Sequence, residues 1–117
     1  MTTRTATTHT FYIGVDDELP LLQEYLLNSD DTPIDLTNAT SIKLWVWIFD
    51  SGVQTLIVDG EAGTFLDKPA GLVQFAFTAS HTATRGEYQR RWKAEFPGTK
   101  LISVPNDRTH GYPVVIS

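Results

Sequence analysis

The chain has 117 residues, of which 41% are hydrophobic, with a net charge of −5 at pH 7 and no cysteine. This length suits one domain that buries its core without disulfide bonds. No apolar run approaches the ~20 residues that a transmembrane helix needs, so we expect no membrane partner. The Thr-rich start lacks the apolar segment of a secretory signal, so we expect synthesis in the cytoplasm. The acidic total disfavours nucleic acid as a partner.

Charge is distributed unevenly along the chain. Residues 1–67 hold eleven acids and two bases, a net of −9, whereas residues 68–117 hold three acids and seven bases, a net of +4. Opposite patches steer association, so this asymmetry would suit head-to-tail packing of copies. We favour the alternative, in which strands from both halves interleave and the asymmetry averages out.

Residues 1–8 are polar and are predicted to form a flexible N-terminal arm, which leaves residues 9–117 as the folded domain. The domain consists of short runs rich in β-branched and aromatic residues, separated by turn residues. The strands are predicted at residues 11–13, 19–27, 41–49, 53–58, 72–78, 87–96, 100–104 and 112–116. Residues 59–71 are interpreted as loops with a linking segment that Phe65 anchors.

No segment has convincing helical periodicity, although residues 78–84 have room for a single helical turn. Strands that recur about every ten residues with turn chemistry between them are typical of a β-sandwich. We therefore predict an all-β fold, an immunoglobulin-like antiparallel β-sandwich of seven to eight strands.

The corner at residues 84–88, Thr-Arg-Gly-Glu-Tyr, is similar to the tyrosine corner of immunoglobulin-like sandwiches. In that motif the phenol bonds back to the backbone just upstream and fixes the start of a central strand. Thr84 stands where the motif usually has Asp. Two residues after Tyr88 comes Arg90, where antibody domains have a cysteine. We expect Arg90 either to extend out of the sandwich or to pair with an acid.

The strand predicted within residues 41–50, Ser-Ile-Lys-Leu-Trp-Val-Trp-Ile-Phe-Asp, has two apolar faces. One face carries Ile42, Leu44, Val46 and Ile48, and the other carries Lys43, Trp45, Trp47 and Phe49. Two apolar faces on one strand indicate that something covers each of them. We favour another protein as the cover of the second face, narrowly ahead of a segment of the same chain. Sugar stacking on Trp45 and Trp47, whose Cα atoms lie ~7 Å apart at this spacing, is the third reading.

Nothing in the sequence predicts catalysis, a metal site or a cofactor. The three histidines are far apart, and none has the spacing of a zinc ligand pair: His9, His81 and His110. Neither a nucleophile elbow nor a Gly-rich phosphate loop is present. We therefore expect no enzyme activity.

Two groups of acids are candidate sites. Asp59, Glu61 and Asp67 flank a Gly-containing loop, but their order does not match an EF-hand, and solvated loop acids are the favoured interpretation. The acids at residues 16–18 lie too close together to form a carboxylate pair across a sugar.

Several segments, in order, resemble small immunoglobulin-like phage domains, similar to the N-terminal domain of phage baseplate upper proteins. The first is Asp-Thr-Pro-Ile-Asp-Leu-Thr-Asn-Ala-Thr at residues 31–40, where the family has dGtpiDLTgAt. Gly-x-Val-x-Phe at 71–75, Gly-x-Tyr at 86–88, Pro-Gly at 97–98 and Val-Pro-Asn-Asp at 104–107 follow. The spacing covers residues from about 10 to 117, and Asp31 departs from the family's usual Gly.

The resemblance implies a non-enzymatic structural protein of a tailed-phage particle, in the tail, the baseplate or the head–tail region. Its alternation assigns Ile42, Leu44, Val46 and Ile48 to the core. The outward positions of this strand usually alternate with Lys, Arg or Thr, but two of them are Trp here. We therefore expect Lys43, Trp45, Trp47 and Phe49 to contact other virion proteins or copies of this chain.

This interpretation predicts that Trp45→Ala or Trp47→Ala weakens assembly and leaves the monomer folded. Two alternatives stay open. One is a carbohydrate-binding or host-adhesion module that takes a host glycan, and the other is a capsid decoration protein.

Overall fold

The computed structural model describes residues 10–28, 30–105 and 111–117. They form strands without any helix, and so contain no apolar helix that could cross a membrane. The strands are β1 (Phe11–Ile13), β2 (Leu22–Tyr25), β3 (Ser41–Asp50), β4 (Val53–Ala62), β5 (Thr64–Asp67), β6 (Leu72–Phe75), β7 (Gly86–Phe96), β8 (Lys100–Val104) and β9 (Tyr112–Ile116). The N-terminal arm predicted at residues 1–8 lies outside the described residues.

The all-β prediction is confirmed, but the predicted strand count was wrong. Nine strands form within the described residues because the expected linking segment around Phe65 is itself a strand, β5, paired with β6. Strand β4 also continues to Ala62, beyond the predicted end at residue 58. Gly60 has a φ of +68°, a conformation that glycine adopts readily, and it forms a bulge here instead of ending the strand.

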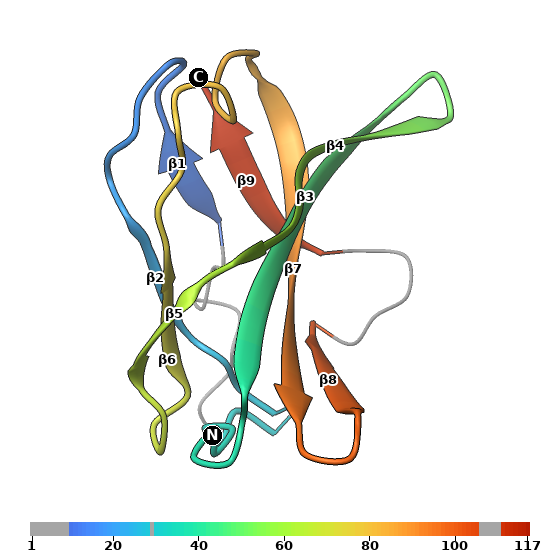
Figure 1. Ribbon diagram of the computed structural model, residues 1–117. Coiled ribbons are helices and arrows are strands. Elements are labelled where there is room, and N and C mark those ends of the chain that lie inside the picture. The colour runs from blue at the N-terminus through green and yellow to red at the C-terminus, as the bar shows by residue number, and fades with distance from the viewer. Residues whose placement is uncertain (1–9, 29, 106–110) are drawn as a thin grey trace, which may run out of the picture.

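The strands form two sheets (Figure 1). The larger has the order β1-β9-β7-β3-β4, with β8 also paired to β7, and the smaller has the order β2-β6-β5. Strands β9 and β8 follow one another along the same edge of β7, because β9 pairs with residues 86–90 and β8 with residues 92–96. The expectation of a purely antiparallel fold was wrong, since β1 runs parallel to β9.

Both sheets combine strands from the acidic and the basic halves of the sequence. In the larger sheet β7 of the basic half pairs with β3 of the acidic half, and in the smaller sheet β6 pairs with β2 and β5. The favoured prediction of interleaved strands is therefore confirmed.

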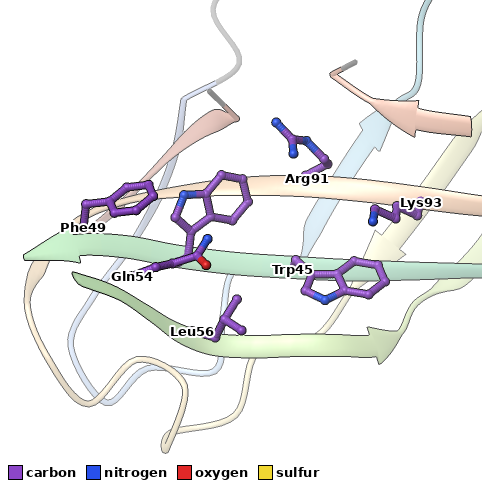
Figure 2. Close-up of a pocket in the computed structure, with 7 residues that line it drawn as sticks. Trp45, Phe49, Gln54, Leu56, Arg91 and Lys93 are labelled. Atoms are coloured by element: carbon purple, nitrogen blue, oxygen red, sulfur yellow. The ribbon is translucent and has the colours of Figure 1, made fainter. Parts of the chain in front are cut away.

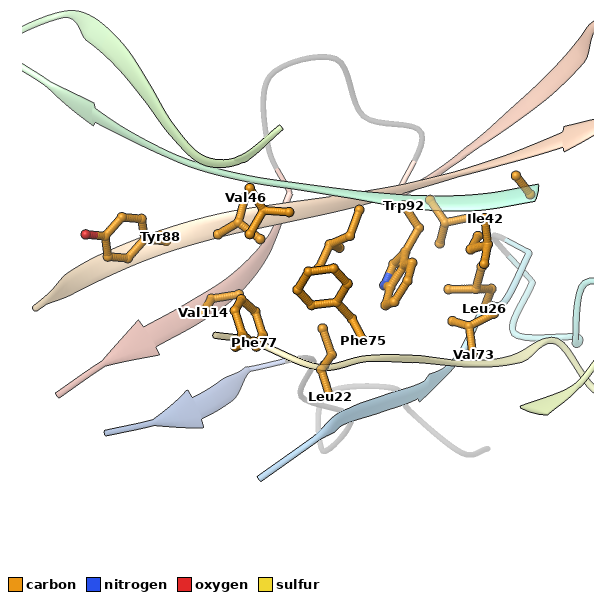
Figure 3. Close-up of a cluster of buried hydrophobic side chains, with 14 of the residues drawn as sticks. Leu22, Leu26, Ile42, Val46, Val73, Phe75, Phe77, Tyr88, Trp92 and Val114 are labelled. Atoms are coloured by element: carbon orange, nitrogen blue, oxygen red, sulfur yellow. The ribbon is translucent and has the colours of Figure 1, made fainter. Parts of the chain in front are cut away.

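The hydrophobic core lies between the two sheets (Figure 3). Leu22 and Phe75 of the smaller sheet point toward Val46 and Trp92 of the larger one, and Trp92 is fully buried. Phe75 packs edge-on against Phe77, with ring centroids 5.1 Å apart. At about 25 cal/mol per Å² of apolar area removed from water, this layer is the main favourable term in folding.

The tyrosine corner forms as predicted. Tyr88 is buried, and its hydroxyl donates to the backbone carbonyl of Thr84 at 2.9 Å. Desolvation raises the pKa of this phenol above its ordinary value. The bond fixes the start of β7, the strand that occupies the centre of the larger sheet.

Arg90 pairs with an acid, which was one of the two expectations for it. Its Nε and Nη2 donate to the two carboxylate oxygens of Glu24 at 2.8 and 2.9 Å, and its Nη1 donates to the Pro113 carbonyl at 2.6 Å. Trp92 Nε1 donates to the same carboxylate. The Arg90 side chain is only 2% exposed, so this ion pair joins β2 of one sheet to β7 of the other inside the sandwich.

Candidate interface site

Strand β3 separates a closed face from an open one. Ile42, Leu44 and Val46 are buried in the core, and Ile48 is half-buried against it, as the sequence predicted. The alternate residues Lys43, Trp45, Trp47 and Phe49 therefore face away from the smaller sheet. The predicted interface residues thus share one face of the larger sheet, which we call the outer face.

Two bulges in β4 shape the outer face beside β3. Trp45 lies opposite Asp59 while Leu44 lies opposite Glu61, so Gly60 is extra, and Ile57 is extra in the same way. A Cβ atom on Gly60 would lie 2.7 Å from Cζ2 of Trp45. The bare glycine backbone therefore lets the Trp45 indole lie close against β4.

The outer face is hollowed into a groove of about 570 Å³ (Figure 2). We call it the outer groove; its lining residues are Trp45, Trp47, Phe49, Gln54, Leu56, Arg91 and Lys93. Phe49 is 56% exposed and Leu56 is 41% exposed. Apolar surface thus remains in contact with solvent on a sheet whose other face is already packed.

The charged groups that line the outer groove are cations. Lys93 Nζ lies 4.9 Å from the ring centroid of Trp45, and the Arg91 guanidinium lies 5.3 Å from that of Trp47. Lys43, which is exposed, sits directly opposite Lys93 in the β3–β7 register. Like charges that face one another across strands are destabilising, so the groove favours a partner that brings carboxylates.

Trp47 differs from the other predicted interface residues because it is only 5% exposed. Arg91 covers its ring, and Gly111 packs so closely that a Cβ there would lie 2.9 Å from Cη2 of Trp47. Its buried Nε1 has no hydrogen-bond partner among the described residues. Trp47 is thus the floor of the groove, whereas Phe49 and Lys43 are exposed and Trp45 is partly exposed.

The sequence alone did not identify Gln54, Leu56, Arg91 and Lys93 as neighbours of the aromatic strand. In the sequence, residues 87–96 alternate so that Arg91 and Lys93 fall on the opposite face from Trp92, but only the β3–β7 register shows which strand lies beside them. The outward position of Leu56 could not be predicted from alternation. The bulge at Ile57 puts Leu56 on the outer face and Val58 in the core, although both positions are even-numbered.

Two of the residues considered as metal ligands or acids, His81 and Glu61, contact one another. His81 Nδ1 accepts the Thr78 N–H at 3.0 Å, and His81 Nε2 lies 2.8 Å from a Glu61 carboxylate oxygen. In residues 10–28, 30–105 and 111–117 no three His, Asp or Glu side chains come close enough to hold a metal ion. His9 and His110 lie outside the described residues.

Neither a family of proteins nor any curated protein matches this chain in sequence.

Proposed function

We propose that this chain is an immunoglobulin-like β-sandwich that serves as a non-enzymatic structural protein of a tailed-phage particle. In this proposal it belongs to the tail, the baseplate or the head–tail region, and it acts through protein–protein contacts in assembly. The outer groove, with exposed Phe49 and Leu56 above a buried Trp47, is the observation that carries it.

The order of strands supports the immunoglobulin-like part of the proposal. Strands β9-β7-β3-β4 of the larger sheet face β2-β6-β5, which is the arrangement expected for strands G, F, C and C′ opposite B, E and D. The hydrogen bond from Tyr88 to Thr84 is that of a tyrosine corner at the start of strand F. The Arg90–Glu24 pair joins strands F and B, which antibody domains join by a disulfide.

The segment at residues 31–40 carries the resemblance to phage domains, and its Asp-Leu-Thr motif forms a defined turn. One Asp35 carboxylate oxygen accepts the backbone N–H of Thr37 at 2.9 Å and its hydroxyl at 2.5 Å. This Asx turn explains the Asp-Leu-Thr sequence, and the hydroxyl bond is the main cause that lowers the pKa of Asp35. Asp31, at φ 69°, adopts the left-handed conformation that the family's usual Gly would favour.

A protein partner suits the outer groove better than a sugar. Sugars stack on an open aromatic face, but Lys93 lies over one face of Trp45 and Gly60 packs against its six-membered ring. Phe49 and Leu56 add exposed aromatic and aliphatic surface, and the polar groups beside it are the Gln54 amide and the Arg91 and Lys93 cations, which already lie over tryptophan rings. A partner segment with an apolar side chain and a carboxylate would match both the floor and the cations of the groove.

The test begins with the particle. Mass spectrometry of purified particles from cells that carry the gene should detect this chain, and proteins encoded by neighbouring genes should copurify with it. A chain that is absent from the particles would overturn the proposal.

Variants then test the groove. Phe49→Glu and Lys43→Glu should each weaken the complex with a copurifying virion protein by about tenfold or more, since a few residues carry most of the binding energy of an interface. Leu66→Glu is the matched control, because Leu66 is 43% exposed but lies in β5 of the smaller sheet. Equal binding by all three variants would place the interface elsewhere, and specific signals on a glycan array that Phe49→Glu abolishes would favour the host-glycan alternative.

A further inference from the structure

Strand β4 forms an outer edge of the larger sheet. Among the described strands it pairs with β3 alone, so the backbone groups along its other edge have no partner strand. Residues Val53 to Leu56 are all exposed, and Val53 is 63% exposed. Figure 1 shows the β3–β4 hairpin projecting beyond the two layers, so nothing in the described fold covers this edge.

Residues 53–56 of this edge lack the charges, prolines and bulges that usually prevent strand pairing. Natural edge strands carry Lys, Pro or inward-pointing charges that keep other strands away. The residues of β4 from 53 to 58 are Val-Gln-Thr-Leu-Ile-Val, with neither a charge nor a proline. The first extra residue of the strand is Ile57, so residues 53–56 form a regular segment that can accept a further strand.

The turn of the hairpin determines which N–H groups point outward. Ser51 and Gly52 have φ of 53° and 79°, as in a type I′ turn, and Asp50 pairs with Val53 across it. Such a two-residue turn is closed by a hydrogen-bonded pair, and bonded and free positions then alternate. The backbone groups of Gln54 and Leu56 therefore point to the open edge, whereas those of Thr55 point to β3.

We propose that two copies of this chain pair through β4 in antiparallel orientation about a twofold axis at Thr55. In this register Gln54 of one copy forms a hydrogen-bonded pair with Leu56 of the other, and the two Thr55 residues face one another. The two larger sheets become one continuous sheet. Because Leu56 also lines the outer groove, the two outer grooves adjoin across the axis.

Charge and side-chain chemistry favour a second copy as the occupant. In the proposed register the facing residues 53–57 of the two copies are all uncharged, so no like charges oppose one another within the paired segment. Facing threonines are a favourable cross-strand pair. The uncharged segment is thus complementary to itself, and an isologous contact of this kind closes as a dimer rather than as a fibre.

Single cysteines test the register directly, because the natural chain has none. In a non-hydrogen-bonded antiparallel pair the two Cα atoms lie ~4.5 Å apart, within the range of a disulfide. Thr55→Cys should therefore form a disulfide-linked dimer under mild oxidation, about tenfold faster or more than Val53→Cys, whose two thiols would lie ~13 Å apart along the strands. Equal rates for the two variants would overturn the register.

A charge on the edge tests the dimer itself. Thr55→Lys places two ammonium groups opposite one another and should raise the dimer dissociation constant about tenfold or more in sedimentation analysis. Ala83→Lys adds the same charge on an exposed loop and should leave it unchanged. A natural chain that sediments as a monomer at about 1 mM would overturn the dimer. This outcome is independent of the proposed function, because Thr55 does not line the outer groove.

Discussion

The two faces of the larger sheet differ in how far their side chains are buried and hydrogen-bonded. On the inner face even the polar groups are partnered, because Arg90 and Trp92 both donate to Glu24. On the outer face Phe49 and Leu56 remain exposed, and the buried Nε1 of Trp47 has no partner among the described residues. Among the described residues, the inner face is thus closed by side chains of the same chain, whereas part of the outer face stays open.

This difference separates the residues that build the fold from those that are free to serve contacts. A buried N–H without a partner lowers the free energy of unfolding by about 1–3 kcal/mol. Exposed aromatic rings contribute no burial energy while solvent surrounds them. A partner that covers the groove would remove the exposed surface of Phe49 and Leu56 from water. The comparison therefore predicts that substitutions on the inner face reduce stability, and that those at the rim of the outer groove reduce association.

The largest expected effect is on the inner face. Glu24→Gln keeps the shape of the side chain but leaves the guanidinium of Arg90, only 2% exposed, without its counter-charge. Removing one partner of a buried ion pair costs about 3–5 kcal/mol, so we expect urea unfolding to show a loss of that size.

Two further variants sharpen this measurement. Glu87→Gln removes an exposed carboxylate from the same strand as Arg90 and should change stability by no more than about 0.5 kcal/mol. The double variant Glu24→Leu with Arg90→Met should recover much of the loss, because an apolar pair needs no counter-charge. A loss below about 1 kcal/mol in Glu24→Gln would show that the pair is not what joins the sheets there.

The second largest effect concerns Trp47, which belongs to the outer face but is buried. Trp47→Ala removes a large ring from beneath Arg91 and beside Gly111, so we expect a loss of about 3 kcal/mol in the free energy of unfolding. This revises the sequence-based expectation that the monomer would tolerate it. Thermal unfolding of the purified chain checks the result, and an unchanged midpoint would mean that Trp47 is not packed as described.

The fold was more predictable from sequence than the candidate site. Alternation in residues 41–50 identified the buried face of β3, and the Gly-x-Tyr corner predicted the Tyr88 hydrogen bond, because both patterns are local. The partner of Arg90 was not predictable, since Glu24 lies 66 residues earlier and an acid in a strand usually faces solvent. The groove depends on a register and on bulges that only strand pairing determines.

A smaller effect is expected at the edge of the inner face. Tyr88→Phe keeps the buried ring but leaves the Thr84 carbonyl without its phenol donor, and should cost about 1 kcal/mol in urea unfolding. Burial raises the pKa of Tyr88, so its protonated form favours the folded state. That contribution is complete below the ordinary tyrosine pKa of about 10 and is lost as pH rises through the folded-state pKa.

The same variant therefore predicts a pH dependence. Between pH 8 and pH 11 the natural chain should lose more stability than Tyr88→Phe, measured as the difference between their unfolding free energies at each pH. If the unfolding free energies of the two proteins fall in parallel with pH, ionisation of the Tyr88 phenol does not destabilise the folded state.

The smallest effect on stability is expected at the rim of the outer groove, and it decides the comparison between the two faces. Phe49 is 56% exposed and lies on the part of β3 that pairs only with β4, so Phe49→Ala should change the free energy of unfolding by no more than about 0.5 kcal/mol. The same substitution should weaken binding to the proposed virion partner about tenfold or more, because in this proposal the ring is desolvated only in the complex. Urea unfolding and titration calorimetry on one preparation measure both quantities. A variant that loses stability but binds normally would make Phe49 a part of the fold, and the outer face would then be as self-contained as the inner one.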